Sequence, residues 1–155
     1  MQTLQIDEKN ARKLYPTADS VFKQMLVDTF GEKFFSQKIT DRVQTFDDIL
    51  SISGKTMADI AKPGDTIDEI AYKKGKLIAE VYNEGIKLDP MDTKQYKYFP
   101  WHIIDPSSGF GLSYDDCDYW ASTAAVGVRL CFQDPNHAVD AGKKFIDVYA
   151  DFKIK

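Results

Sequence analysis

The residues most suited to metal binding or catalysis fall in one run, GFGLSYDDCDYWASTAAVGVRLCF, at positions 109–132. Three aspartates, both cysteines and an arginine lie in it: Asp115, Asp116, Asp118, Cys117, Cys131 and Arg129. Carboxylate oxygens are the ligands that calcium and magnesium prefer, and thiolates act as nucleophiles. The run therefore poses two hypotheses, a metal or catalytic site and a β-hairpin whose unusual residues serve packing.

The surrounding pattern favours the hairpin. The aspartates lack EF-hand spacing, and paired aspartates are common in tight turns, so we expect no bound metal. The cysteines match no zinc motif, so both are predicted to be free thiols. Cys131 has no evident activator other than Arg129 and is predicted to be inert. No serine or cysteine motif surrounds His102 or His137.

Two short segments resemble parts of phosphate-binding loops. GKT at 54–56 and SGFG at 108–111 lack the other glycines and the flanking elements of such loops. We therefore expect no cofactor. Without a recognisable nucleophile, base and metal constellation, the sequence favours a protein that is not an enzyme.

The elements that position these residues follow from periodicity and capping signals. Apolar residues at three- and four-residue steps predict helices over 7–15, 19–30, 45–53, 66–84 and 134–152. Short aromatic and β-branched runs predict strands at 96–104, 109–114 and 126–132. The sequence thus predicts an α+β fold of N-terminal helices, a three-stranded antiparallel β-meander and a C-terminal helix, in a single domain, 1–155.

Side-chain alternation along this meander predicts two different faces. With a turn near Ala124, Cys117 lies opposite Cys131. The apolar face is expected to be core and holds Phe99, Trp101, Ile103, Trp120, Val128, Leu130 and Phe132. The other face holds both cysteines together with the candidate binding residues Tyr96, Tyr98, His102, Tyr119 and Arg129. Helices that cover this second face, with Arg129 paired to an aspartate, are the alternative interpretation.

Composition limits the partners. The chain has 20 Lys and Arg against 24 Asp and Glu, a net charge of −4, so little attracts it to nucleic acid or to an anionic membrane. No stretch approaches the roughly 18 apolar residues of a membrane span, and the opening MQTLQIDEKNARK lacks the pattern of an export signal. We expect a cytoplasmic protein that does not bind membranes.

Several segments carry a resemblance. TKQYKYFPW, SGFG, CDYW, VGVRLCF and AGKKFIDVYADF are similar to a family of small uncharacterised proteins that recur in bacterial genomes, prophages and mobile elements, and IDEKNARKLYP and ITDRVQTFDDIL are similar to that family's opening. The family's commoner signature has a serine where this chain has Val128. The resemblance implies a phage or mobile-element origin and assigns no catalytic residue. A shorter likeness, of YWASTAAVGVRL to the end of C-type-lectin-like domains, conflicts with the helical first half.

Together these observations predict a non-enzymatic binding protein that contacts another protein, or a second copy of itself, through Tyr96, Tyr98, His102, Tyr119 and Arg129. Two alternatives stay open. One is a small-molecule-binding protein or enzyme with a pocket around His102, Arg129 and the turn at 115–118. The other is single-stranded nucleic-acid binding by the Tyr-Lys-Tyr run at 96–98.

Overall fold

The computed structural model of the chain describes residues 5–155. Contacts divide the chain into two compact units, Met1–Arg42 and Val43–Lys155. Each unit is described below by itself, and the single domain remains a prediction. Within residues 5–155, no helix combines the length and the apolar character needed to cross a membrane.

The first unit is helical. Its elements are α1 (Glu8–Leu14), the 3₁₀ turn η1 (Tyr15–Thr17), α2 (Ser20–Phe30), α3 (Glu32–Ser36) and α4 (Ile39–Arg42). Asp7 and Asp19 cap α1 and α2 by accepting hydrogen bonds from the backbone N–H groups of Asn10 and Phe22, as their positions before the apolar runs predict. Gly31 ends α2 with a φ of 86°, in a region that favours glycine.

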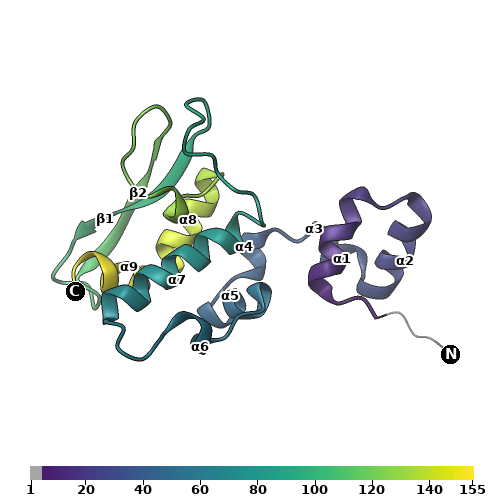
Figure 1. The fold of residues 1–155 in the computed structure, drawn as a ribbon, viewed down its shortest axis with the longest axis horizontal. Coiled ribbons are helices and arrows are strands. Elements are labelled where there is room, and N and C mark those ends of the chain that lie inside the picture. Colours follow the sequence, from purple (N-terminus) through teal and green to yellow (C-terminus); the bar gives the residue numbers. More distant parts are fainter. Residues whose placement is uncertain (1–4) are drawn as a thin grey trace. The chain divides into compact units, whose positions relative to one another are not determined.

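The second unit contains the remaining helices and the sheet. Its elements are α5 (Phe46–Ser53), α6 (Met57–Ile60), α7 (Ile67–Tyr82), β1 (Lys97–Ile104), β2 (Leu112–Trp120), the 3₁₀ turn η2 (Val128–Leu130), α8 (Pro135–Lys144) and α9 (Ile146–Lys153). Capping boxes at Thr45, Thr56 and Thr66 start α5, α6 and α7. The α+β class is confirmed (Figure 1). The predicted C-terminal helix is two helices, because Phe145 leaves the helical conformation, with φ −112° and ψ 34°.

The described sheet has two antiparallel strands, so the predicted three-stranded meander is wrong. Residues 126–132 form η2 and one isolated bridge, in which Tyr98 and Phe132 exchange backbone hydrogen bonds of 2.9 and 2.7 Å. Pro100, two residues beyond Tyr98 on β1, has no N–H to continue this ladder. On the other side of the bridge, Asp134 already caps α8, with Pro135 at its first position. The third strand therefore ends after one pair.

The first hairpin, between the strands predicted at 96–104 and 109–114, is present and turns between Ile104 and Leu112. The second hairpin, with a turn near Ala124, is absent, and β2 runs through the aspartates that the sequence placed in a turn. Trp101 pairs with Asp116 and His102 with Tyr114, which leaves Asp115 as an extra residue in β2. Helices α7, α8 and α9 lie together beside the hairpin (Figure 1), and α8 packs against both strands.

The two faces of the hairpin are covered in a different way from the prediction. α8 approaches the face that holds Pro100 and Tyr114 so closely that a methyl group on Gly142 would lie 2.5 Å from Pro100 Cβ. On the other face, Phe99 is buried, but Trp101 is 50% exposed and Ile103 is 49% exposed. The expectation that Phe99, Trp101 and Ile103 form one core face is therefore wrong for the last two.

Candidate functional site

Three of the five predicted binding residues form an exposed aromatic group, called here the tyrosine cluster: Tyr96, Tyr98 and Tyr119. The ring centroids of Tyr96 and Tyr119 lie 4.9 Å apart in an edge-to-face contact, and Tyr98 lies 6.0 Å from Tyr119. Tyr96 is 52% exposed and Tyr119 is 56% exposed. The cluster thus presents mutually supported rings to solvent.

Backbone pairing explains why these rings meet. Tyr98 and Tyr119 are direct partners across the hairpin. Because Tyr98 gives both of its backbone groups to Phe132, its pair with Tyr119 is of the non-hydrogen-bonded type, which brings side chains closest. The segment that holds Phe132 is itself fixed by Asn83, whose side-chain amide donates to the Cys131 carbonyl (2.9 Å) and accepts from the Gln133 N–H (2.9 Å).

His102 lies on the same face of β1 as Tyr98, but it packs against the helices. Its Nε2 lies 3.0 Å from the Gly142 carbonyl oxygen, so this nitrogen carries the proton. Nδ1 then accepts a hydrogen bond from Lys153 Nζ (3.1 Å), and the ring lies 5.0 Å from that of Tyr149. Burial lowers the pKa of His102 below its ordinary value of 6.5. The structure does not bring His102 into the tyrosine cluster.

Arg129 also lies apart from the cluster. It is exposed in η2, and the neighbouring Leu130 packs against α7 beside Gly75. Within residues 5–155, the guanidinium makes no ring contact, ion pair or hydrogen bond. The alternative in which Arg129 pairs with an aspartate is therefore not what the described chain shows.

The aspartates of β2 bind the backbone of their own strand. Asp116 Oδ1 accepts the Cys117 N–H (2.8 Å), and Asp118 Oδ1 accepts the Tyr119 N–H (2.7 Å). Tyr98 and Tyr119 form a non-hydrogen-bonded pair. The backbone N–H and C=O of Tyr119 therefore point away from β1, toward the open edge of β2. The two carboxylates thus already accept hydrogen bonds from the N–H groups with which an added strand would have to pair. In residues 5–155, no group of three or more His, Cys, Asp or Glu side chains is placed to hold a metal ion.

The cysteines are separate, and both are free thiols. Cys117 pairs with Pro100 rather than with Cys131. Cys131 instead packs in the core with Phe99 and Trp120, where burial raises the pKa of its thiol to about 11. Burial also raises the pKa of Cys117. Both thiols are therefore poor nucleophiles near neutral pH.

One buried cation was missed by the sequence reasoning. Lys97 is fully buried, its ammonium donates to the Asp92 carbonyl (2.6 Å), and it lies 5.1 Å from the centre of the Trp120 ring. Because side chains alternate along a strand, the position of Lys97 between Tyr96 and Tyr98 does predict that its side chain points away from the cluster. Its burial depends on the segment around Asp92, which the local pattern does not predict.

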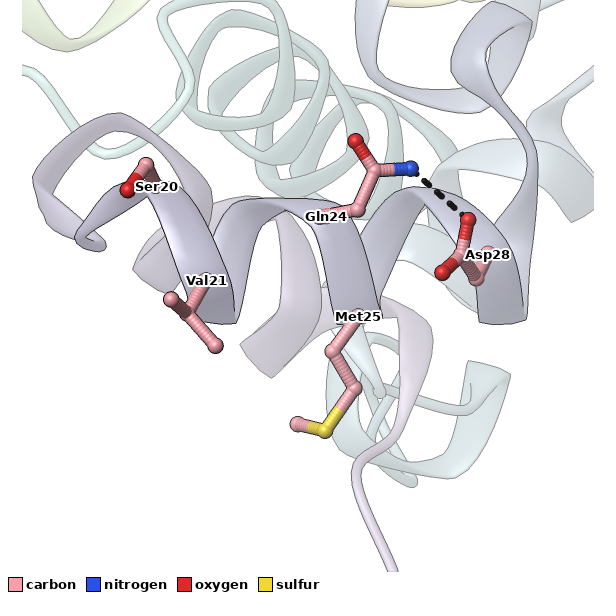
Figure 2. A pocket seen from close by; sticks show the side chains of 5 residues that line it. All are labelled: Ser20, Val21, Gln24, Met25 and Asp28. Atoms are coloured by element: carbon pink, nitrogen blue, oxygen red, sulfur yellow. Dashed lines mark hydrogen bonds between the residues drawn. The ribbon is translucent and has the colours of Figure 1, made fainter.

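Surface depressions lie elsewhere on the chain. One follows the exposed side of α2, where Val21 and Met25 project into solvent one helical turn apart and Gln24 Nε2 donates to Asp28 Oδ1 (Figure 2). The expected apolar stripe of α2 is thus divided: Leu26 is buried, whereas Val21 is 79% exposed. A second depression runs along α7 beside Tyr72 and Phe152.

In comparisons with known proteins, no family model, curated protein or solved structure matches this chain. The resemblance to small phage-associated proteins therefore stays a prediction, and the site must be argued from its own geometry.

Proposed function

We propose that this chain is a binding protein that recognises a protein partner through the tyrosine cluster. The observation that carries the proposal is the mutual contact of Tyr96, Tyr98 and Tyr119 while two of the rings remain more than half exposed. Tyrosine is enriched at the centres of protein interfaces because one side chain offers a large apolar area and a polar tip.

Restraint of the rings supports the same proposal. Each ring of the cluster is held by another ring, and Tyr98 is held at its backbone by Phe132. A side chain that is already ordered loses less conformational entropy when a partner binds. The cluster therefore costs less to immobilise than three isolated tyrosines would.

The geometry gives less support to the two alternatives. A small-molecule pocket would need His102, Arg129 and the aspartates to converge, but His102 lies against α8 and α9, and Arg129 lies on η2 beside α7. Nucleic-acid binding by the cluster would require nearby cations, but Lys97, the only lysine or arginine of the two strands, is buried. A protein partner requires neither arrangement.

Site-specific photo-crosslinking tests the proposal. A benzophenone amino acid replaces Tyr119 in one variant and Tyr72, an exposed tyrosine of α7, in a control variant. We expect one protein to crosslink from position 119 and not from position 72. Calorimetry with that purified protein should then show at least about a tenfold loss of affinity for Tyr96→Ser/Tyr119→Ser. Equal crosslinking from both positions, or an unchanged affinity, would refute the proposal.

A further inference from the structure

The face of the hairpin opposite α8 is open around Trp101 and Ile103, which are 50% and 49% exposed, and this part is called here the open face. Pro100 of β1 and Tyr114 of β2 pack against α8, whereas Trp101 and Ile103, which alternate with Pro100 and His102 along β1, point to the other side. Trp101 is half exposed, with its ring centroid 6.3 Å from that of buried Phe99. An indole supported on one side and open on the other is a preformed contact surface.

Carboxylates lie directly across from this apolar row. Asp116 is the pairing partner of Trp101, and Asp118 is the partner of Phe99, so all four side chains share one face. Each aspartate uses Oδ1 for its neighbour's N–H and makes no ion pair within residues 5–155. The only lysine of the two strands, Lys97, is buried. This open face therefore combines exposed apolar area with unneutralised negative charge.

We infer that the open face binds an arginine-bearing segment of a protein partner, with a guanidinium stacked on Trp101 and hydrogen-bonded to Asp116. Charge complementarity selects a cation, and the adjacent indole selects arginine over lysine. The guanidinium is planar and weakly hydrated, so it stacks on an aromatic ring while its N–H groups reach a carboxylate. The lysine ammonium carries the same charge, but it is not planar and does not present several N–H donors in one plane.

The segment binds through side chains rather than as an added strand. The N–H groups of Cys117 and Tyr119 on the open edge of β2 already have acceptors in Asp116 and Asp118, so that edge offers few donors for β-pairing. This surface goes beyond the proposed function because the tyrosine cluster lies on the opposite face of the hairpin.

Binding of two defined peptides tests the inference. One is a short peptide of alternating arginine and alanine, and the other is its lysine counterpart of equal length. Trp101 is half exposed and Trp120 is 6% exposed, so a change in tryptophan fluorescence on titration reports mainly on Trp101. We expect the arginine peptide to bind several-fold more tightly than the lysine peptide.

Variants measured by calorimetry locate the site. Trp101→Ala and Asp116→Asn should each weaken the arginine peptide by about fivefold or more. Asp147→Asn, an exposed residue at the start of α9, removes the same charge and should change little. Equal affinity for both peptides, or an equal loss for Asp147→Asn, would overturn the inference in favour of unspecific charge attraction. Tyr96→Ser/Tyr119→Ser should retain peptide binding; a loss there would show that the two surfaces are not separate.

Discussion

Tyr98 exchanges both of its backbone hydrogen bonds with Phe132, at 2.9 and 2.7 Å, although the two residues belong to no common sheet beyond this single pair. This bridge ties the segment after η2 to β1 and orients the tyrosine cluster. Phe132 also packs edge-on against Tyr82 of α7, at 5.8 Å between ring centroids. The bridge therefore joins the hairpin to α7.

Asn83 should be essential to this junction. Asn83→Ala removes the side-chain bonds to the Cys131 carbonyl and the Gln133 N–H at a site that is 5% exposed. Buried groups left without partners cost about 1–3 kcal/mol. We expect a loss of that order in the free energy of unfolding, measured by urea denaturation. Asn136→Ala, at an exposed position of α8, is the control and should change stability little; a similar loss there would contradict the explanation.

Gly142 should be required for the contact between α8 and the hairpin. A Cβ at this position would lie 2.5 Å from Pro100 Cβ and 3.0 Å from the Tyr114 ring. Gly142→Ala should therefore destabilise the chain by about 1–3 kcal/mol, despite the gain in helix propensity of about 1 kcal/mol. Gly109→Ala meets no atom within 4 Å and should be nearly neutral. Thermal unfolding of the two variants compares them directly.

His102 should make stability depend on pH in the weakly acidic range. Burial lowers its folded-state pKa below the ordinary 6.5, so the unfolded chain binds a proton first as pH falls. The free energy of unfolding should be highest above pH 6.5, fall as pH drops through 6.5, and level off below the folded-state pKa. Lys153, which donates to Nδ1, further opposes a second positive charge at this position.

Urea denaturation at a series of pH values measures this dependence. His102→Gln should remove most of the slope between pH 7 and about pH 5, a window above the range in which the aspartates of lowered pKa, such as Asp48 and Asp105, change charge. One group contributes at most about 1.4 kcal/mol per pH unit, and the partial exposure of His102 reduces the size of the effect. An identical slope in the variant would assign the dependence to other groups.

Asp118 should protect the open edge of β2. Asp118→Ala leaves the Tyr119 N–H without its intramolecular acceptor, which makes the edge available for pairing with another chain. We expect concentration-dependent self-association in sedimentation velocity, with a stability change below about 1 kcal/mol because the site is exposed. Asp115→Ala removes the same charge from the extra residue of β2. If both variants associate equally, loss of charge rather than loss of the cap is the cause.

Local signals predicted most helices well. The caps at Asp7, Thr45 and Asp134 and the helix end at Gly31 were predictable, because each depends on hydrogen bonds or dihedral angles within a few residues. For the helices that begin after Asp19 and Thr66, the sequence left two neighbouring starts open. Alternation in β1 also placed Tyr98 and Trp101 on opposite faces.

The errors arose where distant segments compete. A β-rich pattern at 126–132 predicted a third strand, but Pro100 and the cap of α8 leave room for a single bridge. The predicted second hairpin, with its turn near Ala124, paired Cys117 with Cys131 and assigned Arg129 to the tyrosine face. In the structure Phe132 instead bridges to Tyr98 of β1. Side-chain period gives the two faces of a strand, but it does not say which face a helix will cover.

The sequence by itself determined the α+β class, the starts of most helices and the two-faced character of β1, since these depend on interactions between near neighbours in the chain. Only the tertiary structure decided that α8 covers the His102 side, that Trp101 and the tyrosine cluster stay exposed, and that Lys97 is buried. Those outcomes depend on which long-range contacts exclude water from a given surface, and residues far apart in the chain make those contacts.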